Sequence, residues 1–383
     1  MSEQKQIINC VNYNGDDCAC GFYRMHFPMM SLKTVLGGEY RFKFLESENP
    51  ILDARYYQSL SNLRVIRIQR WFQKQHATIV KNFLKPLCER LGIWLVYEID
   101  DVLLYDEIPK YNLARPHFSP EIIGNSVQEI FDCCDLITVT TEELKNIYVE
   151  NLHQDPNKFL VIPNYLPRWW IGDSFNLDNQ LKQYDQQRQK PHIAFACSTN
   201  HFDVKNANNG VDDFTEIMPW IKKNLNKYQF IFVGGIPQQL QEEARKGLVI
   251  AQPPSDLMNY PRELKLRKID LLIAPLINSK FNQCKSNIKW LEMSAIGIPM
   301  IGQNICTYNK YTDQVFDTTD DIDLWMDKLF FRKNSRDFYA NIILKNRQIV
   351  DGNDQTPGYW LERNIKRYYS LYSLPQNTVK LDF

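Results

Sequence analysis

The sequence predicts an α/β protein of two Rossmann-like, doubly wound domains that face each other across a cleft. Short apolar runs alternate with longer amphipathic stretches, the pattern of strand–helix units around a parallel sheet. Two such series occur, separated at 166–190 by a stretch rich in Gln, Asp and Asn. We therefore expect an N-terminal domain at 1–165, a connection at 166–190, a C-terminal domain at 191–355, and a closing helix and tail at 356–383.

Composition restricts the class of protein but not its partner. The 383 residues are 44% hydrophobic and 23% charged, with 45 basic and 45 acidic side chains, so only local charge patterns carry information. Nine cysteines, scattered in apolar contexts and without zinc-ligand spacing, indicate reduced thiols and no metal site. No signal peptide and no apolar run of about 18 residues is present. These features predict a cytoplasmic protein without a transmembrane segment.

In the first half, apolar runs predict six strands, at 6–13, 40–45, 63–69, 93–99, 136–140 and 159–163. The run IWLVYEI at 93–99 is continuously apolar, as expected of a central parallel strand. Helices are expected from near Tyr23, at 72–91 with a kink or break at Pro86, and at 120–133. A further helix begins after Thr140 or Thr141, either of which can cap it.

The second half repeats the alternation without repeating the sequence. Strands are expected at 192–197, 228–233, 248–251 and 269–274, and another begins at Met300. Helices are expected at 213–225, 260–267 and 287–295, with a closing helix at 357–374. The helix at 287–295 is flanked by a polar loop and by Gly297, which suits a left-handed C-cap before Pro299.

The stretch 281–302, FNQCKSNIKWLEMSAIGIPMIG, combines a helix start with charge. Apolar side chains three and four residues apart form one stripe of the helix. Lys285, Lys289 and Glu292 have a similar spacing and lie on another side. A helix start offers free amides to an anion, and two lysines with a carboxylate suit a pyrophosphate and a ribose. The alternative is an ordinary strand–helix unit with surface Lys–Glu pairs.

This stretch resembles the donor-binding helix of GT-B glycosyltransferases of the family-4 type. The resemblance is carried by Lys285-Ser286, Lys289, Leu291-Glu292, Ala295, Gly297 and Pro299. In that family two Glu residues eight positions apart handle the donor sugar and the nucleotide ribose. Glu292 matches the second, but Cys284 stands at the first, and Asn282, Lys285 or Ser286 are the candidates to replace it. The runs CDLITVTTEELKNIY and VIPNY also resemble the end of a GT-B N-terminal domain.

The resemblance implies a metal-independent glycosyltransferase that retains anomeric configuration and has a C-terminal helix crossing back to the first domain. A nucleotide sugar is then a co-substrate and no cofactor is needed. Lys285, Ser286 and Lys289 are expected to bind the diphosphate, and Glu292 the ribose. Further candidate donor contacts are Gly21 and Arg24 after the first strand, and Ser198 and His201 after the strand at 192–197. A turn glycine and surface side chains are the alternative interpretation.

Asp100 and Asp101 follow the central strand, at its carboxyl end. Adjacent carboxylates can share a proton, which raises the pKa of one of them. One is therefore expected to act as the acceptor base or to orient the acceptor hydroxyl. The alternative is that one caps a helix and the other is solvated. A DxD metal motif is absent from the sequence.

The segment 54–88 contains seven basic residues and no Asp or Glu: Arg55, Arg64, Arg67, Arg70, Lys74, Lys81 and Lys85. Such a segment suits a polyanion, and Arg67, Arg70 and Lys74 are candidate acceptor contacts. The acceptor is then either a glycan or hydroxymethylated cytosine in DNA, the latter fitting a bacteriophage enzyme in an infected host cell. The alternative is a solvated helix together with arginines that pair with acids elsewhere in the chain. A non-catalytic nucleotide- or glycan-binding protein on the same fold is also open.

Overall fold

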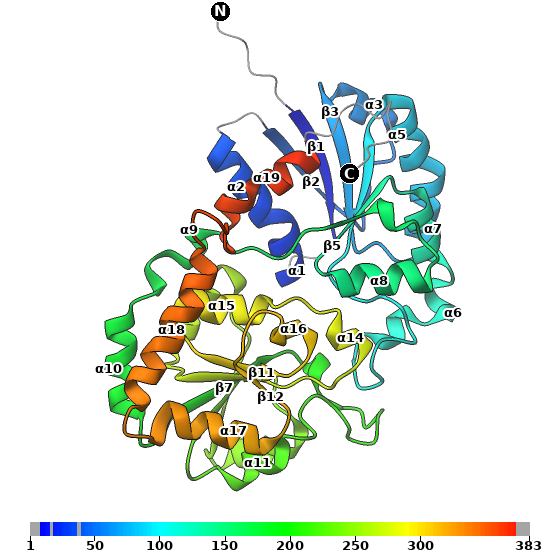
Figure 1. The fold of residues 1–383 in the computed structure, drawn as a ribbon. Helices are drawn as coiled ribbons and strands as arrows, with labels where there is room; N and C mark the ends of the chain where they lie inside the picture. Colours follow the sequence, from blue (N-terminus) through cyan, green and yellow to red (C-terminus); the bar gives the residue numbers. More distant parts are fainter. Residues whose placement is uncertain (1–7, 16–17, 37–39, 373–383) are drawn as a thin grey trace, which may run out of the picture.

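A computed structural model describes residues 8–15, 18–36 and 40–372, and Figure 1 shows two sheet-based domains joined by crossing segments of the chain. Each domain has a six-stranded sheet whose described pairings are parallel, with helices around it. The predicted class, two doubly wound α/β units, is confirmed. The first expected strand and the closing helix are present from Ile8 and up to Tyr372. Their predicted extensions at 6–7 and 373–374 lie outside the described residues.

The first sheet has the order β2-β1-β3-β4-β5-β6. Its strands are β1 Ile8–Asn14, β2 Tyr40–Glu46, β3 Leu63–Gln69, β4 Trp94–Glu98, β5 Leu136–Val139 and β6 Phe159–Val161. Its α- and π-helical segments are α1 Ala19–Gly21, η1 Phe22–His26, α2 Phe27–Leu36, α3 Ala54–Ser59, α4 Lys74–Ile79, η2 Val80–Leu84, α5 Lys85–Leu91, α6 Pro120–Ile123, α7 Ser126–Cys133 and α8 Glu142–Asn151. All five residues of β4 are buried, as its apolar run predicts.

Two helices of this domain are interrupted where the sequence contains Pro or Gly. The stretch expected as one helix at 72–91 contains a π-helical turn, η2, just before Pro86. Proline has no N–H to donate, so the regular ladder cannot continue through it. The stretch at 120–133 is divided at Gly124, whose φ is +56°. The π-helical turn η1 similarly lies between α1 and α2, and it carries Tyr23 and Arg24 toward the domain boundary.

The second sheet has the order β12-β11-β10-β7-β8-β9. Its strands are β7 His192–Cys197, β8 Gln229–Gly234, β9 Val249–Gln252, β10 Leu271–Ala274, β11 Met300–Gln303 and β12 Val315–Phe316. Its longer helical segments are α11 Met218–Lys223, α12 Gln241–Arg245, α13 Tyr260–Leu266, α14 Lys280–Gln283, α15 Ile288–Ile296, α16 Cys306–Asn309, α17 Thr319–Met326, η9 Asp327–Phe331 and α18 Ser335–Asp351. The helix expected from Asp213 begins only at Met218, which leaves Asp213 in a loop.

Two segments cross between the domains side by side. The connection contains α9 Arg168–Ile171 and α10 Leu177–Gln187, so it is more ordered than its polar composition suggests. The return crossing precedes α19 Leu361–Tyr372, which packs against α2 of the first domain (Figure 1). The backbone of Leu166, in the first crossing, forms two hydrogen bonds with the return crossing. Its N–H donates to Tyr359 O at 3.0 Å, and its carbonyl accepts from the N–H of Leu361 at 2.9 Å. The predicted crossing helix is therefore confirmed.

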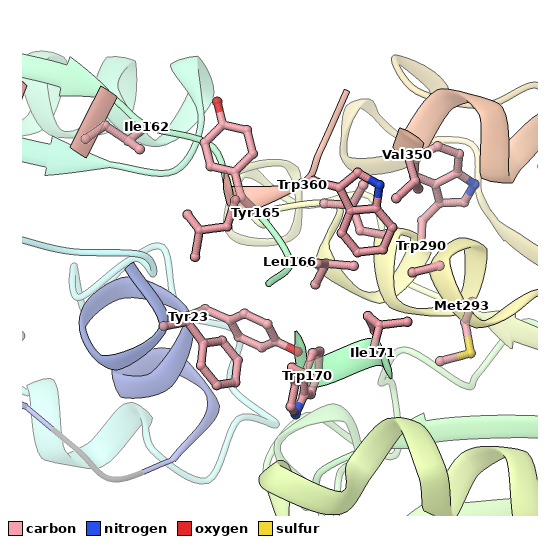
Figure 2. Close-up of a cluster of buried hydrophobic side chains, with 14 of the residues drawn as sticks. Tyr23, Ile162, Tyr165, Leu166, Trp170, Ile171, Trp290, Met293, Val350 and Trp360 are labelled. Carbon is pink, nitrogen blue, oxygen red and sulfur yellow. The ribbon is translucent and has the colours of Figure 1, made fainter. Parts of the chain in front are cut away.

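The apolar core continues through this junction (Figure 2). Tyr23 of the first domain packs edge-on against Trp170 of the connection, with ring centroids 5.7 Å apart. Trp290 of α15 and Trp360 of the return crossing belong to the same buried cluster. A shared core of this kind holds α15 at the boundary between the domains. Over the described part of the chain, every helix is too short or too polar to cross a membrane.

Candidate functional site

Lys285 and Lys289 lie at the start of α15, next to the domain boundary. Both side chains are half-buried, and within the described residues neither forms an ion pair. Burial lowers the pKa of Lys289, and the charge of Lys285 adds to this effect. Asn287, the N-cap of α15, does not cap the helix with its side chain, so the first-turn amides remain available. Two cations without ion pairs in the described chain, beside such amides, make a site that favours an anion.

Glu292 lies one helical turn beyond Lys289 and is 7% exposed. The sequence pattern placed it off the apolar stripe, but nearly all of α15 is buried, Glu292 included. The Tyr23 hydroxyl, from the first domain, donates a hydrogen bond to Glu292 Oε1. Burial raises the pKa of Glu292 to about 7, although Tyr23 and Lys289 act in the opposite direction. A ribose hydroxyl at this carboxylate would have to share or displace the bond from Tyr23.

The residues before α15 connect the second domain to the first. Cys284 is buried in the apolar core of the first domain, and its carbonyl accepts a hydrogen bond from Thr141 Oγ1 at 2.9 Å. Ser286 is half-buried, and its hydroxyl accepts from Asn164 Nδ2 at 2.9 Å. Asn282 is fully buried and bonds within the second domain. Among the candidates to replace the missing carboxylate, the Asn282 amide nitrogen and the Ser286 hydroxyl already have partners, whereas Lys285 has no ion pair within the described residues.

The loop after β7 is shaped by two carboxylates that accept backbone hydrogen bonds. Asp203 accepts from the N–H groups of Ala207, Asn208 and Gly210, at 2.7 to 2.9 Å. Asp212 accepts from the N–H groups of Asp203 and Phe214 at 2.9 and 2.8 Å. The turn between them uses left-handed backbone at Asn206 and Asn209, which asparagine tolerates better than most residues. This self-bonded loop fixes the position of the next carboxylate, Asp213.

Asp213 is the centre of a buried network that joins both domains. Its Oδ1 accepts from the Tyr111 hydroxyl at 2.8 Å, the Ile277 N–H at 2.8 Å and Asn282 Nδ2 at 2.9 Å. Its Oδ2 lies 2.6 Å from His201 Nδ1. Burial acts to raise the pKa of Asp213, but these bonds and nearby charges lower it below the ordinary value. Asp213 is therefore a carboxylate.

The sequence interpretation selected His201 but missed Asp213 and Tyr111. Asp213 was placed at the start of a helix, where a carboxylate has an ordinary capping role. Tyr111 follows β4 in a long irregular segment and gave no periodic signal. The sequence feature that could have indicated Asp213 is the pair of adjacent acids in VDDF, which follows a turn rich in Asn and Gly.

Ser198 follows β7 and is exposed at the carboxyl edge of the second sheet. Its hydroxyl accepts from the Asn200 N–H at 3.4 Å and so begins the turn that leads to His201. Gly234, at the end of β8, allows the neighbouring strand end to approach: its φ is +97°, and a Cβ there would lie 2.6 Å from the Cys197 carbonyl oxygen. Ser198 and His201 thus lie on one loop of the edge that also carries α15.

Arg24 and Arg67 are inside the first domain, and both side chains are fully buried against Glu98 of β4. Arg24 Nε donates to Glu98 at 2.5 Å, and its Nη1 donates to Ile162 O at 2.6 Å and Asn164 Oδ1 at 3.0 Å. Burial acts to raise the pKa of Glu98, but the two guanidinium groups lower it. The expected contacts of Arg24 with a donor phosphate and of Arg67 with an acceptor phosphate do not fit this burial. Glu98, a lone acid in an apolar strand, was the missed signal.

Gly21 also differs from its expected role. It lies in α1 with helical φ of −59°, so it makes no turn. The close approach at the end of β1 is made by Gly15, where a Cβ would lie 2.4 Å from the Gln69 carbonyl oxygen. Glycine is required there because β1 and β3 converge at their carboxyl ends.

Asp100 and Asp101 are distinguished by their surroundings. Burial raises the pKa of Asp100, against the opposing effect of Arg70, whose Nη1 lies 3.9 Å from Asp100 Oδ1. Asp101 accepts from the Val102 N–H at 3.0 Å, and its carbonyl accepts from the Tyr148 hydroxyl at 2.8 Å. The raised pKa makes Asp100 the better proton acceptor of the two. Asp101 instead fixes the backbone here through its hydrogen bonds. Arg70 was expected on an acceptor-binding surface, but its guanidinium group forms an ion pair with Asp100.

The basic segment 54–88 is largely neutralised by acids outside it. Four of its cations form ion pairs: Arg55 with Asp53, Arg67 with Glu98, Arg70 with Asp100, and Lys85 with Asp135. Within the described residues Arg64, Lys74 and Lys81 form none. Lys74 is exposed, donates to the Glu121 carbonyl at 2.9 Å, and lines a surface cavity of about 340 Å³. The alternative, a solvated helix with arginines paired to acids elsewhere in the chain, is thus the better description of this segment.

Within residues 8–15, 18–36 and 40–372, no three His, Cys, Asp or Glu side chains are grouped so that they could hold a metal ion. The cations of the candidate site are Lys285 and Lys289.

No family model matches the chain, and no curated protein matches it in sequence. Solved structures do. The chain is similar to a glycosyltransferase from Rickettsia africae ESF-5, with a TM-score of 0.59 and 13% identity over 96% of this chain and 98% of that one. It is also similar to Anabaena Alr3699/HepE in complex with UDP-glucose, with a TM-score of 0.59 and 10% identity over 96% and 99%. The chain therefore has the two-domain GT-B fold of these proteins.

Proposed function

We propose that this protein is a glycosyltransferase that moves a sugar from a nucleoside-diphosphate sugar to an acceptor hydroxyl. One observation carries the proposal: Lys285 and Lys289, half-buried and without ion pairs in the described chain, flank the free amides at the start of α15. This cationic site lies at the junction of the two domains of a GT-B fold. A diphosphate leaving group needs such stabilisation, and amides with fixed cations supply it without reorganisation.

The other side chains take roles around this diphosphate site. Glu292 is suited to the ribose hydroxyls, once its bond from Tyr23 is shared or displaced. Ser286 lies between the two lysines in sequence and adds a hydroxyl to the site. Asp100, with its raised pKa, is suited to receive the acceptor proton. We further propose metal-independent transfer with retention, as the resemblance to the family-4 type implies, in the cytoplasm.

The acceptor we favour is a saccharide hydroxyl rather than a hydroxymethylated base in bacteriophage DNA. A DNA acceptor would need a basic face, and only Arg64, Lys74 and Lys81 of the segment 54–88 lack ion pairs among the described residues. If DNA is nevertheless the acceptor, duplex binding should fall with a logarithmic salt slope of about −0.9 per phosphate contact. Replacing these three by Gln should then flatten the slope. Absence of duplex binding at low salt would eliminate this alternative.

The donor site is tested by calorimetric titration with a panel of nucleotide sugars, beginning with UDP-glucose. Lys285→Ala combined with Lys289→Ala should weaken binding about 100-fold or more, because each charged hydrogen bond contributes roughly 1.5–3 kcal/mol. The matched control is Lys222→Ala with Lys223→Ala, two exposed lysines at the end of α11. Equal affinities for the double variant and the control, with native circular dichroism, would contradict the proposal.

A non-catalytic binding protein on the same fold is separated from an enzyme by turnover. An enzyme is expected to hydrolyse its nucleotide sugar slowly when no acceptor is present, and Asp100→Asn should lower transfer to a true acceptor about 10²–10⁴-fold. A protein that binds the nucleotide sugar tightly but never releases the free sugar fits the binding function instead.

A further inference from the structure

The hydrogen bonds around Asp213 hold the ring of His201 in one orientation, which diphosphate binding does not require. Asp213 is 4% exposed, and its two oxygens accept hydrogen bonds from four donors. Two of these donors, the Ile277 N–H and Asn282 Nδ2, come from the segment after β10 in the same domain. A third, the Tyr111 hydroxyl, comes from the first domain. A buried carboxylate held from both domains is fixed in orientation, and it fixes the orientation of its fourth partner, His201.

The ionised Asp213 determines which nitrogen of His201 carries the proton. A carboxylate only accepts, so His201 Nδ1 must be the N–H that donates to Asp213 Oδ2. In the neutral ring Nε2 is then an acceptor, and within the described residues no group bonds to it. The ring is neutral near pH 7, because burial and the charges of Lys285 and Lys289 lower its pKa to about 4 against the opposing effect of Asp213.

A neutral imidazole adds no positive charge to a diphosphate site. The lysines already supply that charge, and they are close enough to act on His201 electrostatically. What His201 offers is a lone pair beside the diphosphate-binding lysines. Two parts of a nucleotide sugar carry hydroxyl donors near the diphosphate: the ribose, for which Glu292 is suited, and the donor sugar. The hydroxyl groups left for His201 are therefore those of the donor sugar.

We propose that Asp213 is a positioning residue that presents His201 Nε2 as an acceptor for a hydroxyl of the donor sugar. Tyr111 belongs to the first domain, so one of the hydrogen bonds that hold Asp213 depends on contact between the domains. The inference rests on the proposed function, because it assigns the sugar-contacting group of the same site. It also assigns a polar contact to the sugar in a chain where Cys284 occupies the position of the family's first Glu.

The tautomer of His201 is measured directly on the full chain by ¹⁵N NMR of the imidazole nitrogens, with His201→Gln identifying the signals. We expect Nδ1–H in the wild type at pH 7. Asp213→Asn should shift the population toward Nε2–H, because the Asn side chain can donate to Nδ1. Asp212→Asn is the matched control: it loosens the same loop but does not touch the ring, so the tautomer should not change. An Nε2–H ring or an imidazolium in the wild type at pH 7 would overturn the proposal, even if Asp213→Asn does not fold.

Binding of UDP-glucose and of UDP then separates the sugar contact from the diphosphate contact. His201→Phe should weaken UDP-glucose about tenfold or more and leave UDP unchanged, because only the sugar loses a partner. His201→Gln should recover most of the loss, since its Oε1 can replace Nε2. Tyr111→Phe should act in the same direction but less, because Asp213 keeps three donors.

Different results would overturn the sugar contact and the proposed function. If His201→Phe binds UDP-glucose and UDP as the wild type does, the sugar contact is overturned and the proposed function is not. If the wild type binds neither ligand nor any other nucleotide sugar, the proposed function fails and the sugar contact fails with it.

Discussion

Substitution of Glu292 by Gln should make the protein more stable and worse at binding its donor. In the folded chain, burial raises the pKa of Glu292 to about 7 from an ordinary value of 4.5. The folded state therefore retains a proton that the unfolded state releases between these two pH values, and stability falls as the pH rises through this window. The difference of about 2.5 between the pKa values corresponds to about 3 kcal/mol, lost in full above pH 7.

Gln has nearly the shape of Glu and an oxygen that can accept the bond from Tyr23, but it has no charge to bury. We expect Glu292→Gln to match the wild type below about pH 4.5 and to exceed it by about 3 kcal/mol at pH 8. The assay is urea unfolding at both pH values. The difference between the two proteins removes the contribution of other buried acids such as Asp270, whose pKa burial also raises to about 7.

The same variant should lose roughly 1.5–3 kcal/mol of nucleotide-sugar affinity at pH 8, the range for a hydrogen bond to a charged group. Higher stability with weaker binding is the signature of a carboxylate kept buried for a ligand. Equal stability of the two proteins at pH 8 would refute the burial argument. Unchanged affinity would remove the ribose role while leaving the burial argument intact.

Three further predictions concern the acceptor side, the buried ion pairs of Glu98 with Arg24 and Arg67, and the metal. Asp100→Asn should lower turnover about 10²–10⁴-fold with little change in donor affinity, and Asp101→Asn should lower turnover much less. Equal effects of the two variants in steady-state kinetics would contradict the assignment of Asp100 as the proton acceptor. Arg67→Ala should destabilise the protein by about 3–5 kcal/mol in urea unfolding, because Glu98 loses a buried partner, whereas Arg64→Ala should change it by no more than about 0.5 kcal/mol. Transfer should persist in excess EDTA, and loss of activity that Mg²⁺ or Mn²⁺ restores would show that the two lysines do not replace a metal.

The sequence alone determined the fold class and the positions of most strands in the two sheets. Short runs rich in apolar and β-branched residues located strands such as β3 and β7 to the residue, because such side chains suit the pleated, buried surface of a sheet. The sequence also located α15 with its glycine C-cap, because a positive φ leaves a residue-level signal: Gly297 has φ of +79°. Local rules of this kind depend on neighbours in the chain, so the sequence contains them.

Only the tertiary structure decided what the charged residues do. Arg24 and Arg67 looked like surface cations until the fold placed Glu98 between them, and Asp213 looked like a helix cap until it met a tyrosine from the other domain. The reason is physical: a charge is solvated or buried according to partners that lie tens to hundreds of residues away, and burial reverses its preferred role. A sequence lists the charges, but the free energy of each depends on which other charges the fold brings within hydrogen-bonding distance.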